Sequence, residues 1–206
     1  MASRLDEFTN GWTRAGGALG KSILLLALSV VPALASDGVL EINQTCAVQT
    51  GCFAGDTAGF PVTIDGSAGA GRSYQLTSEL IVPDENTSGI RFTQPLANNS
   101  TIDLAGFSIT RAACVGAVNS CFPASGTGSG IEVATITIRG IAVLDGNITG
   151  MGAYGVSLGD HSLVKDLRVR WNRAAGIQVL LGSLVSGCTS VQNQGGGIVG
   201  TSSVTV

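Results

Sequence analysis

The chain has 206 residues, which is enough for one domain of ordinary size with a buried core. Charged residues make up only 12%, glycine is frequent at 30 residues and proline is scarce at 5. This composition disfavours a helical bundle and favours short strands joined by tight turns. A hydrophobic fraction of 44% with a formal net charge of −3 argues against disorder, and no stretch rich in Lys and Arg suggests a nucleic-acid partner.

The first predicted element is an export signal in residues 1–35. Residues 22–35 form an uncharged apolar run that follows Arg14 and Lys21 and is too short to span a bilayer. It ends in Ala33-Leu34-Ala35, so we expect cleavage after Ala35, with an uncleaved membrane anchor as the alternative. The mature chain would then have no membrane span and would be exported to the periplasm, the cell surface or the medium.

Residues 36–100 are predicted to form an N-terminal capping region and the first strands. The segments 60–64, 73–77, 89–92 and 100–104 alternate in the way that half-buried strands do. A cap is expected here because the first turns of a stacked sheet otherwise expose edge strands and core.

Four of the five cysteines fall into two close pairs. Cys46 and Cys52 are six residues apart, and Cys114 and Cys121 are seven apart within a predicted loop at 111–130. Two short-range disulfides would suit an exported protein, although unrelated thiols remain an alternative. Neither pair has the CxxC spacing of a zinc site, and the chain holds one histidine, so we expect no metal and no cofactor.

Residues 101–206 contain an internal repeat of 21 residues. Gly176-Ile177 recurs at Gly197-Ile198 and Leu163-Val164 at Leu184-Val185. One repeat earlier the spacing is 25, both from Gly130-Ile131 to Gly155-Val156 and from Asn147 to Asn172. We therefore expect the extra residues in the turn between Asn147 and Gly155. Insertions confined to one turn are typical of stacked repeats.

A repeat of this length accommodates three short strands, with like residues stacked on like. This assignment points one set of side chains inward (Val164, Leu167, Val169, Ile177, Val179) and another outward (Lys165, Arg168, Arg170). Cys188 aligns with Leu167, so it is predicted to be a buried free thiol; an outward cysteine for intermolecular pairing is the alternative. Asn147, Asn172 and Asn193 are predicted to form a structural ladder at one turn. Val206 matches Val185, so the chain stops within a repeat, which suggests a truncated protein or an end covered by a partner.

Three segments resemble a known family. They are the run from Cys46 to Ile64 with its Gly51-Cys52, Gly55-Asp56 and Gly59-Phe60-Pro61, the segment Ile102–Phe107, and the pattern of Val185, Cys188, Thr189 and Asn193. Together they resemble bacterial right-handed parallel β-helix repeat proteins of the pectin-lyase-like fold. The resemblance covers roughly residues 37–206 and implies an all-β, single-stranded solenoid. It implies little about activity, because many proteins of this fold have no assigned reaction.

Enzymes of that fold act on polysaccharides in a groove along one face of the repeats. Four residues here are candidates for such catalysis: Asp160, His161, Asp166 and Arg170. The acidic and Arg-x-Lys elements of the family's polygalacturonases are absent, and Asp160-His161 also suits an ordinary turn. Arg168, Arg170, Trp171 and Arg173 could instead form a ligand-binding patch or a solubilising outer face.

Three functions follow for this sequence. The first is an exported, non-catalytic protein that binds a glycan or serves as a surface scaffold. The second is a lyase or glycosidase that acts on an acidic polysaccharide. The third is a structural segment of a larger surface or adhesin-like protein. The expected partner is a polysaccharide, and the sequence leaves the oligomeric state open.

Overall fold

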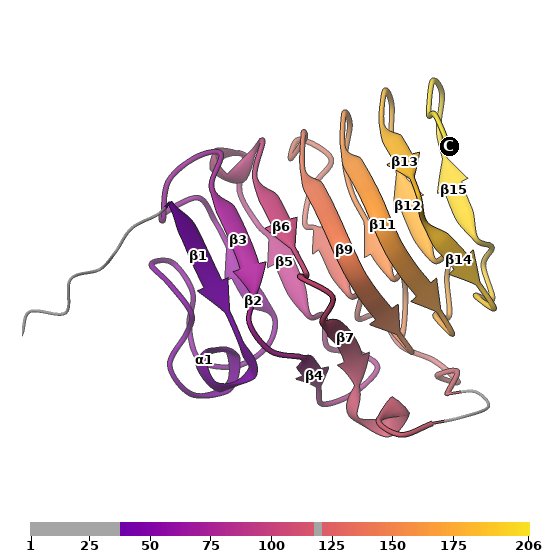
Figure 1. Ribbon diagram of the computed structural model, residues 1–206, viewed down its shortest axis with the longest axis horizontal. Helices are drawn as coiled ribbons and strands as arrows, with labels where there is room; N and C mark the ends of the chain where they lie inside the picture. The colour runs from indigo at the N-terminus through magenta and orange to yellow at the C-terminus, as the bar shows by residue number, and fades with distance from the viewer. Residues whose placement is uncertain (1–37, 118–120) are drawn as a thin grey trace, which may run out of the picture. The chain divides into compact units, whose positions relative to one another are not determined.

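Parallel strands make up most of the regular structure in the computed structural model, which describes residues 38–117 and 121–206 (Figure 1). Every strand pair within these ranges is parallel. The expected all-β class is therefore correct. The predicted export signal lies outside the described residues. In the described ranges no helix is long and apolar enough to cross a membrane.

The larger sheet, called sheet A, contains six strands that follow one another along the chain and lie side by side in that order (Figure 1). They are β1 (Val39–Ile42), β3 (Ser73–Leu76), β6 (Thr101–Asp103), β9 (Ala142–Thr149), β11 (Leu163–Arg170) and β13 (Leu184–Ser186). Three more strands extend it beyond a bend: β4 (Leu80–Val82), β7 (Ser108–Arg111) and β14 (Thr189–Val191). The long strands β9 and β11 span both parts, because β9 pairs with β6 and β7, and β11 pairs with β13 and β14.

The second sheet, called sheet B, pairs its strands in the same sequential order. It consists of β2 (Val62–Ile64), β5 (Ile90–Phe92), β8 (Ile131–Val133), β10 (Val156–Ser157), β12 (Ile177–Val179) and β15 (Ile198–Gly200). Each strand of sheet B thus follows a strand of sheet A along the chain. The predicted strands at 60–64, 73–77, 89–92 and 100–104 correspond to β2, β3, β5 and β6.

The capping region contributes one short α-helix, α1 (Gln44–Gln49). Asn43 caps its N-terminus by accepting a hydrogen bond from the Cys46 amide through its side chain. The Cys46–Cys52 and Cys114–Cys121 disulfides are both present, as the sequence predicted. Two short 3-10 helices, η1 (Pro95–Ala97) and η2 (Ala112–Cys114), complete the regular elements of the described ranges.

The strand register agrees with the predicted repeat of 21 residues, but the extra residues of the longer repeat lie elsewhere than predicted. Leu163 pairs with Leu184 and Val156 with Ile177, both 21 residues apart, and Ile131 pairs with Val156 at the expected 25. Ala142, however, pairs with Leu163, again at 21. The extra residues therefore lie before β9, between β8 and β9, and the prediction of an insertion between Asn147 and Gly155 is wrong.

The core lies between the two sheets and follows the alternation of the strands. The five side chains predicted to point inward (Val164, Leu167, Val169, Ile177, Val179) are all buried, while Lys165, Arg168 and Arg170 are exposed. Cys188 continues the inward row next to Leu167 and packs, half-buried, against the core. Burial raises the pKa of its thiol and so favours the neutral form. A neutral thiol packs as a small hydrophobic side chain.

Asparagines stack at one corner of the repeat, but Asn147 is not among them. Asn172 is fully buried, and Asn193 accepts hydrogen bonds from its backbone and its side chain. Asn147 lies within β9, where it pairs with Arg168 and donates a side-chain hydrogen bond to the Gly106 carbonyl. Its assignment to the ladder is therefore corrected. Met151, 21 residues before Asn172, occupies that corner, and its amide donates to Asn172 Oδ1.

Left-handed backbone conformations mark three corners in register. One row contains Gly140, His161, Gly182 and Ser203; a second contains Asp145, Asp166 and Gly187; a third contains Gly150, Trp171 and Gln192. Every residue in these rows has a positive φ, and its neighbours in the row are 21 residues away. Positive φ strains residues other than glycine, so these corners have a backbone shape that the repeat imposes.

Candidate ligand-binding groove

The outward side chains of β9, β11 and β14 line a groove on sheet A. In one row Arg168 lies between its strand partners Asn147 and Thr189. In the next row Arg170 lies between Thr149 and Val191. Two cavities of ≈ 440 Å³ and ≈ 320 Å³ share Asn147, Arg168 and Thr189 as lining residues, so they form one continuous depression. We call this depression the sheet A groove.

The positive charge of the groove comes from Arg168 and Arg170, and the carboxylates of Asp145 and Asp166 line the same depression. Arg170 lies over the indole ring of Trp171, with 4.2 Å between the guanidinium carbon and the ring centroid. Trp171 is itself only 3% exposed, and its Nε1 donates to Gln192 Oε1 at 3.0 Å. The indole therefore supports Arg170 and offers no open face to a ligand, which corrects the expectation that Trp171 forms part of a contact patch.

Arg173 lies beyond the corner at Asn172, and it lines neither of the two groove cavities. Its amide donates to the Met151 carbonyl, and its side chain is exposed. Of the four residues predicted to bind a ligand, the groove brings together Arg168 and Arg170.

The candidate catalytic residues are divided between two places. Asp166 and Asp145 occupy one corner row and line the larger cavity, and Asp166 forms an exposed ion pair with Lys165 at 3.6 Å. Asp160 and His161 lie at the other corner, before β11 begins, and line neither groove cavity. The Asp160 carbonyl accepts from the Gly140 amide, which is a backbone role in a turn. The groove thus combines Asp166 with Arg170 and leaves the Asp160-His161 pair outside.

Several groove residues were not predicted to contact a ligand. Asn147, which was assigned to the ladder, lines the groove together with Thr149 and Thr189, and none of the three carries charge. The signal that could have found them is the repeat itself, because Asn147 and Thr189 stand 21 residues on either side of Arg168. Once Arg168 points outward, in-register pairing of parallel strands requires its two neighbours to point outward as well.

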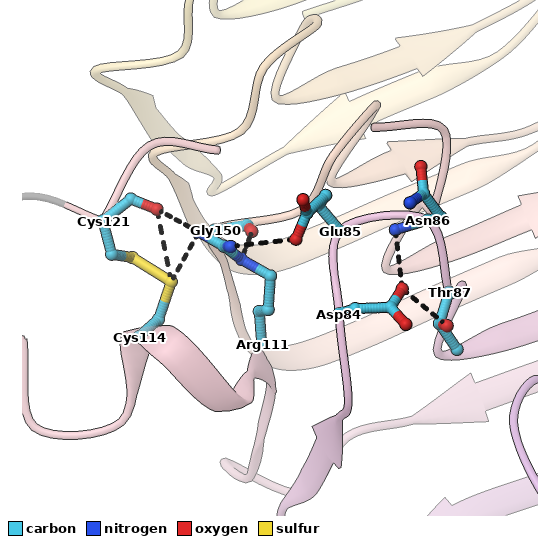
Figure 2. A network of polar contacts seen from close by, with 8 residues as sticks. All are labelled: Asp84, Glu85, Asn86, Thr87, Arg111, Cys114, Cys121 and Gly150. Atoms are coloured by element: carbon cyan, nitrogen blue, oxygen red, sulfur yellow. Dashed lines mark hydrogen bonds and ion pairs between the residues drawn. A yellow bond between two sulfur atoms is a disulfide. The ribbon is translucent and has the colours of Figure 1, made fainter. Parts of the chain in front are cut away.

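A disulfide loop stands at the end of the groove where β9 and β11 finish. The loop begins at Arg111, which is 9% exposed and whose guanidinium lies between Cys121 of the loop, Gly150 at the end of β9, and Glu85 (Figure 2). Its Nε donates to the Gly150 carbonyl at 3.0 Å, and a terminal nitrogen donates to the Cys121 carbonyl at 2.8 Å. The other terminal nitrogen pairs with Glu85 at 3.4 Å.

These contacts hold the two ends of the loop, at Cys114 and Cys121, against the strand end at Gly150. The Cys114–Cys121 disulfide is seated directly on Gly150, where an added Cβ would overlap both sulfur atoms. Asp84, next to Glu85, accepts from the Asn86 amide and the Thr87 hydroxyl, and these hydrogen bonds, that from Thr87 first, lower the pKa of its carboxyl (Figure 2). The segment that carries Glu85 is therefore ordered by its own hydrogen bonds.

The groove offers hydrogen-bond donors and acceptors over a shallow, polar surface. Two guanidiniums, two carboxylates, an amide and several hydroxyls can form hydrogen bonds with the hydroxyl groups of a ligand. In the described part of the chain, no group of three or more His, Cys, Asp or Glu side chains could hold a metal ion. Comparisons of the chain with protein-family models, with curated proteins and with solved structures found no match.

Proposed function

We propose that the chain folds as a right-handed parallel β-helix, similar to proteins of the pectin-lyase-like fold, and is exported. The constant register supports the first part, because Ala142, Leu163 and Leu184 pair in succession at steps of 21 residues. Two disulfides support the second part, because such bonds persist in oxidising compartments.

We further propose that the protein binds a glycan without cleaving it, in the sheet A groove. The observation that carries this proposal is the row of Asn147, Arg168 and Thr189, which continues without interruption across three neighbouring strands. Parallel strands repeat every ~4.8 Å, so a polymer lying across them meets a polar side chain at each step. An extended sugar chain presents hydroxyl groups at a comparable spacing along its length.

A polysaccharide-cleaving enzyme is the second candidate. Asp145, Asp166 and Arg168 line the same cavity, and a carboxylate beside a guanidinium could take part in acid–base chemistry on an acidic sugar. The position of Asp160 and His161 outside the groove weighs against this candidate. A structural segment of a larger surface protein is the third candidate, and it requires no ligand at all.

The experiment is a glycan array followed by product assays. Wild-type protein is screened on plant, algal and bacterial polysaccharides, and each bound glycan is then tested for new reducing ends and for unsaturated products. Binding without product supports the glycan-binding proposal; product formation supports the enzyme; neither result favours the structural segment.

Variants locate the binding. Arg168→Gln is expected to weaken binding by at least tenfold, corresponding to ~1.4 kcal/mol. Arg139→Gln is the matched control, because Arg139 is exposed at a corner away from the cavities of the groove. Equal affinity of Arg168→Gln and wild type would contradict the assignment to this groove.

A further inference from the structure

A third cavity, of ≈ 220 Å³, lies between the disulfide loop and the end of the sheet A groove. Cys114, Val115, Gly116 and Ala117 form its loop side. Its sheet side is formed by Ser108 and by the row of Thr110, Thr149 and Arg170, which are strand partners in succession. We call it the side pocket. It shares Ser108, Thr149 and Arg170 with the neighbouring groove cavity, so the two are continuous.

Two threonines in the side pocket are largely covered, and their hydroxyls face the cavity. Thr110 and Thr149 are each only 9% exposed, although both belong to the outward face of their strands. Neither side chain hydrogen-bonds to any residue in 38–117 or 121–206, whereas both residues line the cavity. Among the described residues, the buried side-chain polar atoms without a hydrogen-bond partner are Tyr74 OH and Ser100 Oγ, so the hydroxyls of Thr110 and Thr149 are reached by solvent in the cavity. A ligand hydroxyl that displaces this water would form its hydrogen bonds with these two threonines.

The rim of the side pocket adds one charge of each sign. Arg170 lines one side, where its stacking on Trp171 restricts the guanidinium. Glu79 lines another side. A guanidinium donates hydrogen bonds, a carboxylate accepts them, and a threonine hydroxyl does both. This combination matches a sugar, because its hydroxyls both donate and accept hydrogen bonds and its ring oxygen accepts them.

The volume of the side pocket limits the size of the ligand that can enter it. Pockets for drug-sized ligands usually measure about 300–1,000 Å³, so the side pocket suits one small ring and not a length of chain. The described part of the loop wall is held at Cys114 and Cys121, because their disulfide is seated on Gly150 and Arg111 donates to the carbonyls of Gly150 and Cys121. A rigid wall lets the pocket discriminate by shape.

We propose that the side pocket is a specificity subsite that accepts a single-sugar branch projecting from a glycan bound in the sheet A groove. This inference rests on the proposed glycan binding and goes further by naming which glycans are preferred. Thr110 and Thr149 hydrogen-bond the branch, Arg170 contacts both branch and main chain, and residues 114–117 set how large the branch can be.

The test compares linear and branched forms of the same backbone. The probes are mannan oligosaccharides with and without single galactose branches, and xylan oligosaccharides with and without single arabinose branches. For at least one pair, wild-type protein is expected to bind the branched form about tenfold more tightly. The double variant Thr110→Val/Thr149→Val, which keeps side-chain shape and strand preference, is expected to bind both forms with the affinity of the linear one.

The control variant is Thr189→Val, which changes the groove outside the side pocket and is expected to preserve the ratio between branched and linear affinities. Equal binding of both forms by wild type would overturn the side-pocket proposal and leave glycan binding intact. An unchanged ratio in the double variant would do the same and would mean that the pocket holds water only. Absence of binding to any glycan would overturn both proposals. Circular dichroism and urea unfolding verify that each variant is folded.

Discussion

Asn172 and Asn193, 21 residues apart, are joined by a hydrogen bond of 2.9 Å from Asn172 Nδ2 to Asn193 Oδ1. The Asn193 oxygen also accepts from the Asn172 amide at 3.0 Å, and Asn172 Oδ1 accepts in turn from the Met151 amide at 2.9 Å. Side chains thus satisfy backbone amides at a corner where the strands have ended. Two asparagine side chains thus link three successive repeats, which contribute Met151, Asn172 and Asn193.

Replacing Asn172 is therefore expected to destabilise the fold. Asn172→Ala leaves the buried Met151 amide without its acceptor, which costs about 1–3 kcal/mol. Asn147→Ala is the control, because Asn147 lies in the groove, outside the ladder, and should cost less than about 0.5 kcal/mol. Urea unfolding followed by circular dichroism measures both. If both variants lost the same free energy of unfolding, the assignment of Asn172 and not Asn147 to the ladder would be refuted.

A row of glycines before the strands of sheet B limits the distance between neighbouring repeats. A Cβ on Gly155 would overlap the Val169 side chain and lie 2.6 Å from the Gly176 carbonyl oxygen. Gly155→Ala is expected to lower the free energy of unfolding by about 2–3 kcal/mol. Gly197 occupies the same row, but its nearest obstacle is the Ser190 carbonyl oxygen at 3.0 Å. Gly197→Ala should therefore cost clearly less in the same thermal or urea unfolding experiment.

Replacing His161 by glycine is expected to stabilise the fold, in contrast to the replacements of Asn172 and Gly155. His161 is exposed with φ 56°, and its neighbours in the row, Gly140 and Gly182, are glycines. Glycine tolerates this conformation without strain, so His161→Gly is expected to raise stability by about 0.5 kcal/mol. Gly182→Ala should lower it by about 1 kcal/mol, since its Cβ would meet the His161 ring at 3.0 Å. A loss of stability in His161→Gly would disprove the corner strain.

His161→Gly also tests the catalytic alternative. If a glycan is cleaved and His161 takes part, the variant loses turnover while its stability is kept. Unchanged product formation would exclude His161 from the chemistry.

The buried phenol of Tyr74 is expected to make the free energy of unfolding depend on pH in the alkaline range. Its hydroxyl is buried without a hydrogen-bond partner in the described residues, and burial raises the pKa of Tyr74 from 10.0 to about 12. Because the folded state keeps the phenol neutral at a pH where the unfolded chain ionises it, stability depends on pH. The free energy of unfolding is highest with respect to this group below pH 10, and that stability is lost as the pH rises through about 12.

Tyr74→Phe keeps the ring and its tilted contact with Phe53 but removes the hydroxyl. It is expected to gain about 1 kcal/mol at neutral pH. Urea midpoints measured from pH 8 to 11 should fall less steeply for Tyr74→Phe than for wild type. Parallel curves would show that this phenol does not govern the alkaline loss.

The repeat made much of the fold predictable. Identical residue types at equivalent positions of successive repeats determined which side chains of β11 face the core, because a parallel stack pairs like with like. The insertion was misplaced because Asn147 and Asn172 were aligned by residue type at a spacing of 25. In the structure Asn147 pairs with Arg168, and Met151 occupies the position equivalent to Asn172.

The groove was less predictable than the core. Arg168 and Arg170 stood out because they are charged, whereas Asn147 and Thr149 gained their role only from the neighbouring repeat that places them beside these arginines. Trp171 was expected at the surface because it follows exposed arginines, but the corner turns its ring under Arg170. No local sequence pattern predicts that the disulfide loop lies next to Thr110 and Thr149. The position of the loop depends on tertiary contacts of Arg111.

The most direct test of the central claim is a crystal structure of the protein with an oligosaccharide identified on the array. We predict stacked repeats with Leu163 paired to Leu184, and a sugar chain lying across β9, β11 and β14 with hydrogen bonds to Arg168. A glycan bound on sheet B, or at the corner of Asp160 and His161 with the groove empty, would contradict it.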